Sequence, residues 1–181
     1  TRARLARAAL LPLSWLYGAV VAGYRALYDL GVLRVTKLPC RVIAVGNLTV
    51  GGTGKSTATR WLARLLSNRG QRVAVLSYGY HGDRDRADTV TVVSDGERVR
   101  VPVTESGDEP RMLAEALPGV PVLTGPRRVL SGARAVEAFG AEVCLLDDGF
   151  QYWRLRKDLE IVLIDAECPF GHGYLLPRGL L

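Results

Sequence analysis

The stretch from Val42 to Thr57, VIAVGNLTVGGTGKST, constrains the fold of this chain more than any other feature. Its first four residues, VIAV, are apolar and short enough to form a buried parallel strand. A loop that contains four glycines follows, and Trp61, Leu62, Leu65 and Leu66 then recur at helical spacing. A strand, a glycine loop and a helix in this order are the architecture of a phosphate-binding loop.

The residue types of the loop predict how it holds a nucleotide. Glycines let consecutive backbone N–H groups turn toward a phosphate, and the start of the helix adds the positive end of its dipole. Lys55 would reach the β- and γ-phosphates, and the Ser56 hydroxyl would ligate Mg²⁺. The sequence therefore predicts binding of ATP with Mg²⁺. The expected nucleotide-binding residues are Gly51, Gly52, Thr53, Gly54, Lys55, Ser56 and Thr57.

The loop departs from the usual pattern G-x-x-x-x-G-K-[ST] at one position. Glycine normally stands five residues before Gly54, and here that residue is Thr49. The run from Gly51 to Ser56 resembles the GG-x-GK-[ST] loops of one branch of these NTPases. The plain alternative is a glycine-rich turn with a surface lysine. The strand before the loop and the helix after it favour the phosphate-binding interpretation.

Length and charge limit the remaining possibilities. The 181 residues are enough for one α/β domain with an appendage. The net charge of +6 belongs to residues 1–41, where seven Lys or Arg accompany one acid, so a nucleic-acid-binding core is not expected. The three cysteines show neither disulfide nor metal-ligand spacing, which is typical of a reducing cytosol.

Residues 8–24 carry no charge and follow a basic start. A transmembrane helix would need a longer run without Pro12, and a signal peptide would export a nucleotide-binding domain. A helix at the membrane surface fits the helical apolar spacing, the aromatic residues and the flanking arginines. The plain alternative is a helix packed on the core. We expect residues 1–40 to form a membrane-associated helical segment, with the membrane surface contacted through residues 1–28.

Strand and helix patterns alternate through the rest of the chain, so residues 41–181 are expected to form an α/β domain of the P-loop NTPase type. Its sheet would be mostly parallel, with helices on both faces. The last residues show no pattern that closes a domain, so we expect a C-terminal subdomain to be missing. Expected strands are 42–45, 72–77, 120–123, 142–146 and 160–165; expected helices are 57–68, 111–117 and 126–139; and 89–103 is expected to form an inserted β-hairpin.

Two pairs of acids are candidates for chemistry. Asp147 and Asp148 end an apolar strand, the position from which such an acid holds Mg²⁺ beside a phosphate-binding loop. The alternative for this pair is an ordinary Asp-Gly turn. Asp108 and Glu109 precede a predicted helix, where Asp108 could be an N-cap. The other interpretation is that this pair supplies a general base and a metal ligand. The residues alone do not decide between a helix cap and these chemical roles.

The chain resembles the tetraacyldisaccharide 4'-kinase family, the lipid A 4'-kinases. The resemblance runs in family order to the last residue, and LLDDGFQ together with the VGGTGK loop is its specific combination. It implies ATP-dependent phosphorylation of the 4'-hydroxyl of an acylated glucosamine disaccharide 1-phosphate at the cytoplasmic face of the inner membrane. The matching stretches are LPLSWLYG, VGNLTVGGTGKS, VLSYGY, GDEP, LPGVPV, LLDDGFQ, DLEIVLID and GYLLPRG.

The resemblance also implies residue roles. Lys55 matches the loop lysine, and Ser56 matches the metal-binding hydroxyl. Asp108 matches the catalytic aspartate and becomes the expected general base. Glu109, Asp147 and Asp148 match acids placed around Mg²⁺.

This sequence departs from the family at two positions near the phosphates. The family usually has arginine where this chain has Tyr78, and histidine where it has Tyr152. The positive charge that the family's arginine and histidine supply would have to come from another residue here, such as Arg84 or Arg154. The histidine that partners the catalytic aspartate belongs to the expected second domain, and His172 lies in a different motif.

A nucleotide-dependent membrane switch of the variant-loop ATPase type is the competing hypothesis. Such proteins share the glycine loop and the aspartate at a strand end. Their signature lysine before the glycine pair is Val50 here, and no N-K-x-D segment for guanine recognition is present.

Overall fold

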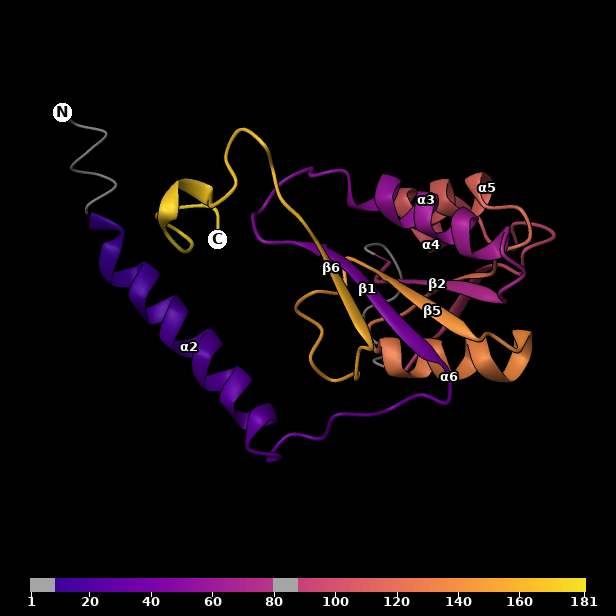
Figure 1. The fold of residues 1–181 in the computed structure, drawn as a ribbon, viewed down its shortest axis with the longest axis horizontal. Coiled ribbons are helices and arrows are strands. Elements are labelled where there is room, and N and C mark those ends of the chain that lie inside the picture. Colours follow the sequence, from indigo (N-terminus) through magenta and orange to yellow (C-terminus); the bar gives the residue numbers. More distant parts are fainter. Residues whose placement is uncertain (1–8, 80–87) are drawn as a thin grey trace.

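The computed structural model describes residues 9–79 and 88–181 (Figure 1). Its centre is a six-stranded sheet with the order β3-β4-β2-β5-β1-β6, in which β3 runs antiparallel to β4 and the other neighbours are parallel. The strands are β1 (Arg41–Asn47), β2 (Val73–Ser77), β3 (Thr91–Ser94), β4 (Val122–Thr124), β5 (Val143–Asp147) and β6 (Leu159–Leu163).

Helices cover both faces of this sheet (Figure 1). One apolar cluster joins the sheet to α3 (Lys55–Ser67) and α5 (Asp108–Ala116), and a second joins its other face to α6 (Arg128–Phe139). The short α4 (Val103–Ser106) precedes α5. The expected mixed α/β fold, with a mostly parallel sheet between helices, is confirmed.

The central strands explain why the sheet forms. Every residue of β2, VAVLS, and of β5, VCLLD, is buried, as expected for parallel strands covered on both faces. Because β1, β2, β4 and β5 are parallel, their carboxyl ends meet at one edge of the sheet. Ligands of open α/β sheets bind outside that edge.

The expected hairpin is wrong in its second arm. β3 forms, but it belongs to the main sheet through β4, and the returning residues make a single bridge between Ser94 and Val99. The Asp95 side chain accepts hydrogen bonds from the backbone N–H groups of Glu97 and Arg98, which closes a tight turn. Pro102 then caps α4, so the second arm ends before it can become a strand.

The helix expected from residue 111 begins earlier. α5 starts at Asp108, directly after Gly107, whose φ of 83° and ψ of 163° favour glycine. Asp108 and Glu109 therefore occupy the first turn of the helix.

α2 (Leu11–Asp29) lies outside these layers, as Figure 1 shows. Within α2, only Ser14 and Tyr28 are buried, which does not fit an ordinary core helix. The Ser14 hydroxyl donates to the carbonyl of Leu175 at 2.7 Å, and the ring of Tyr28 packs near Trp153. In the part of the chain that the structure describes, no helix has the length and apolar character needed to cross a membrane.

The segment after β6 returns to the glycine loop. It contains a short 3₁₀ helix (Gly171–Gly173) and lies between α2 and the loop after β1 (Figure 1). The backbone N–H of Val50 donates to the carbonyl of Leu180 at 2.8 Å. Together with the contact at Ser14, this bond ties α2, the segment and the loop into one arrangement.

Candidate active site

The glycine loop connects β1 to α3 through backbone conformations that favour glycine. Gly51 has a φ of 140°, and Gly54 has a φ of 79° as the N-cap of α3. The Ala58 N–H donates to the carbonyl of Gly54 at 2.9 Å, which starts the helix directly after the loop. The open N–H groups of this first turn therefore face the edge where ligands of such sheets bind.

Lys55 is held at the mouth of this loop. Its ammonium donates to the Asn47 side-chain oxygen at 3.1 Å and to the Gly51 carbonyl at 3.5 Å. It also lies 3.8 Å from a carboxylate oxygen of Asp148. The structure thus brings the loop lysine and the acid pair at the end of β5 together, because β1 and β5 are neighbours in the sheet.

Asp147 is the buried acid of the pair. It ends β5 with 3% of its surface exposed, and the Thr59 hydroxyl donates to its Oδ1 atom at 2.9 Å. Burial raises the pKa of Asp147 to about 6, and the negative charges of Glu109 and Asp148 push the pKa in the same direction. The hydrogen bond from Thr59 and the charge of Lys55 oppose that rise.

Asp148 is exposed and adopts a left-handed backbone conformation, with a φ of 54°. The next N–H group, of Gly149, donates back to the carbonyl of Val45 on β1 at 3.1 Å. This turn places the side chain of Asp148 toward Lys55, while that of Asp147 stays in the core. The two adjacent acids are therefore in different environments.

Asp108 and Glu109 lie in the first turn of α5, and both are exposed. Gly107 occupies the cap position, and Asp108 makes no cap hydrogen bond, so the structure does not support the N-cap interpretation. The electrostatic effect of Glu109 on Asp147 puts this second pair near the first. The charge of Glu109 therefore acts on the acidic turn, and Asp108 lies beside Glu109 at the start of α5.

A Mg²⁺ ion fits this donor set. Among residues 9–79 and 88–181, no three His, Cys, Asp or Glu side chains form a ready metal cluster. Mg²⁺ needs none, because it usually takes one or two carboxylates and fills its shell with water and phosphate oxygens. A buried carboxylate with a raised pKa, beside two more acids, is a site where a cation relieves repulsion.

Sequence reasoning missed Asn47 and Thr59. Asn47 ends β1 and orients Lys55, but nothing in its spacing signals that role. Thr59 could have been found: it lies four residues after Lys55 and therefore on the same face of α3 as the loop lysine.

Of the two arginines named as replacements for the missing family charges, the structure describes only Arg154, which lies away from the glycine loop. Arg154 interacts with the hydroxyl groups of Tyr24 and Tyr28 beside α2, and this contact raises its pKa. His172 lies 3.7 Å from the sulfur of Cys168. Arg84 falls outside the described residues.

Comparisons with known proteins identify relatives of this chain. Residues 6–181 match the family model described as tetraacyldisaccharide-1-P 4'-kinase, LpxK. Two relatives named tetraacyldisaccharide 4'-kinase are similar to the chain. The protein of Syntrophus aciditrophicus is 53% identical over 85% of this chain and 41% of its own length. That of Geobacter metallireducens is 47% identical over 98% of this chain and 52% of its own.

A crystal structure described as "apo" form LpxK from Aquifex aeolicus in complex with ATP has a similar fold. Its TM-score is 0.86 at 40% identity, with 97% of this chain and 53% of that chain covered. The chain therefore spans about half the length of the proteins that it matches.

We predict that burial of Asp147 makes the stability of the metal-free protein depend on pH. Because folding raises the pKa of Asp147 from about 3.8 to about 6, the native state holds its proton more tightly than the unfolded state. The free energy of unfolding should fall by roughly 2–3 kcal/mol as pH rises from about 4 to above 6. Asp147→Asn should remove this component, measured by urea denaturation in EDTA.

Asp29→Asn, which removes an exposed carboxylate on α2, is the control. If the free energy of unfolding of Asp147→Asn fell with pH as much as that of the unmutated protein, the pH dependence would belong to another group.

Proposed function

This chain belongs to the tetraacyldisaccharide-1-phosphate 4'-kinase family, and we propose that its protein phosphorylates a lipid. The reaction transfers the γ-phosphoryl group of ATP to the 4'-hydroxyl of an acylated glucosamine disaccharide 1-phosphate. The observation that carries the proposal is the meeting of Lys55, at the glycine loop, with Asp147 and Asp148 at the end of the neighbouring strand. We further propose that residues 1–40 and 41–181 act as a membrane segment and a kinase domain.

Phosphoryl transfer depends mostly on positioning and on neutralisation of charge. In this proposal, the backbone N–H groups of residues 51–57 hold the β- and γ-phosphates, and the Lys55 ammonium neutralises the transferred group. Lys55 already sits between Asn47 and Asp148, so it needs little rearrangement to act. Ser56, Glu109, Asp147 and Asp148 would hold Mg²⁺, which neutralises charge on the phosphates.

We assign the general base to Asp108. Its carboxylate is exposed in the first turn of α5 and has no cap to form, because Gly107 is the cap residue. An exposed carboxylate next to Glu109, whose charge acts on Asp147, is available to accept the proton of an alcohol acceptor.

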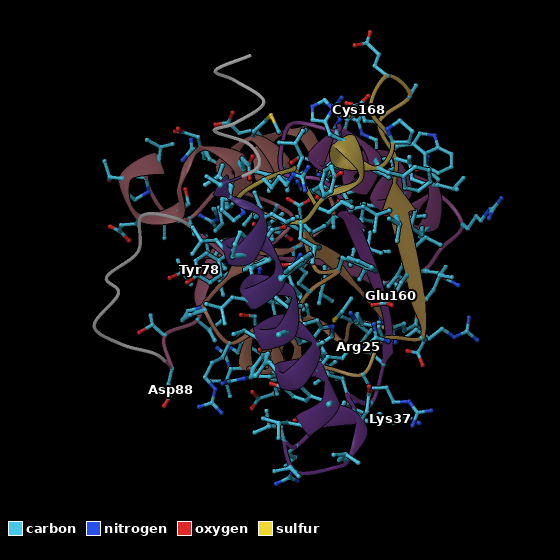
Figure 2. The ribbon with its side chains drawn as sticks, turned by 90° about the vertical axis from the view of Figure 1, so that its left-hand side faces the viewer. Arg25, Lys37, Tyr78, Asp88, Glu160 and Cys168 are labelled. Atoms are coloured by element: carbon cyan, nitrogen blue, oxygen red, sulfur yellow. The ribbon has the colours of Figure 1, made fainter. Side chains whose placement is uncertain are left out.

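The acceptor is proposed to reach the site through a cavity of about 720 Å³ beside α2. Phe150 and Gln151, which follow the acidic turn, form one part of its lining. Aromatic, aliphatic and charged side chains make up the rest, and its cations Arg25 and Lys157 suit a sugar that bears phosphate. Figure 2 shows Arg25 and Glu160, two of these residues, on the same side of α2.

α2 is proposed to hold this cavity at the cytoplasmic face of the inner membrane. Apolar side chains recur along one outward face, with Leu16 61% and Val20 61% exposed. Such a stripe lies flat in a membrane interface, with tyrosine at headgroup level. The exposed large apolar and aromatic residues on α2 are Leu13, Trp15, Leu16, Tyr17, Val20, Tyr24 and Leu27.

The proposed reaction predicts that ATP consumption depends on the acceptor. Full-length protein given labelled ATP and the tetraacylated disaccharide 1-phosphate should place label on the lipid. Lys55→Ala should lower transfer by more than about 100-fold, because the transferred group loses its neutralising charge. The exposed Lys37→Ala is the matched control.

ATP hydrolysis at one rate with and without the acceptor would instead favour the membrane-switch ATPase. The family match gives that alternative no support.

Asp108→Asn should lower kcat by roughly 10²–10⁴-fold, with little change in ATP affinity or melting temperature. A general base acts mainly in the transition state, so its loss spares nucleotide binding. Asp147→Asn should differ by weakening the binding of ATP with Mg²⁺. Glu105→Gln neutralises an acid in the neighbouring α4 and serves as the control. Unchanged turnover in Asp108→Asn would move the base to another residue.

Leu16→Glu with Val20→Glu should abolish binding to anionic phospholipid vesicles and leave ATP affinity unchanged. The substitutions put charge into the apolar face of α2, far from the glycine loop in sequence. Ala22→Glu with Ala26→Glu adds the same charge at exposed positions on another face of the helix. Equal sedimentation of both double variants with vesicles would show that the apolar face is not the membrane contact.

A further inference from the structure

Arg128 lies between two tyrosine rings at the edge of the candidate site. Its Cζ atom is 4.9 Å from the ring centroid of Tyr78 and 5.0 Å from that of Tyr152. Both distances are within the range of a cation–π contact. Arg128 itself is only 8% exposed, so the pair of rings holds a guanidinium that is largely removed from solvent.

The three residues come from three neighbouring parts of the carboxyl edge. Tyr78 follows β2, Arg128 begins α6 just after β4, and Tyr152 follows the acidic turn of β5. The Tyr152 N–H donates to the carbonyl of Gly149 at 3.1 Å, which ties the second ring to the turn that carries Asp147 and Asp148. The cluster is therefore part of the same edge as the proposed phosphoryl-transfer site.

The end of β2 is packed tightly against β4 at this point. A Cβ atom at Gly79 would lie 3.0 Å from the Cβ of Thr124, and Gly79 has a φ of 74°. This close packing fixes where the chain leaves β2, and so where the ring of Tyr78 can lie. Figure 2 shows Tyr78 on the opposite side of α2 from Arg25 and Glu160.

The surroundings of Arg128 are suited to an anion. It is the first residue of α6, so the positive end of the helix dipole adds to its own charge. The hydroxyl groups of Ser131, one turn further on, and of Tyr152 are buried without a hydrogen-bond partner among the described residues. Buried polar groups usually have partners, so these two hydroxyls have hydrogen-bonding capacity left for a polar ligand.

We propose that Tyr78 and Tyr152 are positioning residues, which hold the Arg128 guanidinium ready to bind phosphate oxygens during the reaction. The inference rests on the proposed kinase function and concerns this chain's own departure from the family pattern. The two tyrosines that replace a usual arginine and histidine meet at one arginine, so the two departures form a single structural feature. The phosphate oxygens belong to ATP or to the disaccharide phosphate, and the kinetics separate these sources.

The test is a mutant cycle in the full-length protein. Tyr78→Leu and Tyr152→Leu remove the rings, Tyr78→Phe and Tyr152→Phe keep them, and Arg128→Ala removes the cation. Each leucine variant should lower kcat/KM by roughly 3- to 30-fold, the range of a cation–π contact, and each phenylalanine variant should stay within about 2-fold. In the Arg128→Ala background, the leucine substitutions should have no further effect, because their role depends on the arginine.

The kinetic constants identify the ligand. A rise in the KM for ATP alone assigns the nucleotide phosphates, and a rise in the KM for the disaccharide alone assigns the acceptor phosphate. The melting temperature of every variant is measured as well. If the tyrosine rings had a purely structural role, the leucine substitutions would lower the melting temperature equally with and without Arg128. Leucine substitutions that still lower turnover in the Arg128→Ala background would overturn the inference.

Failure of the proposed function is a separate result. If the unmutated protein transfers no phosphate to the acceptor, calorimetric binding of ATP and of the disaccharide phosphate replaces turnover in the same cycle. Loss of binding of either ligand that requires Arg128 supports the inference. Unchanged binding of both in the Tyr78→Leu, Tyr152→Leu double variant overturns it.

Discussion

The buried carboxylate of Asp147 is the interaction on which the rest of the site depends. A carboxylate at the end of a fully buried strand loses most of its hydration, and one hydrogen bond from Thr59 replaces only part of it. Two further acids nearby increase the repulsion, while Lys55 opposes it. The carboxylates therefore repel one another, and a cation bound between them would relieve this repulsion. A site arranged in this way before its ligands arrive spends little energy on reorganisation during reaction.

Sheet order explains how residues far apart in sequence reach this carboxylate. β5 lies between β1, which leads into the glycine loop, and β2, which leads to Tyr78. Lys55 follows β1, and the acid pair stands at the end of the neighbouring strand β5. The cluster of Arg128 with its two tyrosines lies along the same edge, toward β2 and β4. α2 and the segment after β6 approach from outside, where a backbone hydrogen bond joins Leu180 to Val50 in the loop. The proposed lipid-facing helix and the proposed nucleotide loop are thus structurally connected.

Much of this arrangement could be predicted from the sequence, because its signals are local. The glycine run before Lys55 and the apolar strand before Asp147 each define a strand end, and parallel strands bring such ends to one edge. The second arm of the hairpin failed for a reason that the pattern hides: the Asp95 side chain and Pro102 favour a turn followed by a helix. Arg128 between its two tyrosines was beyond reach, since no spacing in the sequence indicates contacts among residues 78, 128 and 152.

The order of strands also affects when the protein can fold during its synthesis. β1 is made early, but both of its partners in the sheet, β5 and β6, come last among the strands. The bond from Thr59 to Asp147 spans 88 residues, and the bond from the Val42 N–H to the Asp158 carboxylate spans 116. Such long separations slow folding, because the chain must close large loops before the contacts form. The glycine loop therefore leaves the ribosome well before the strands that fix it, and its apolar strand stays unpaired until they emerge.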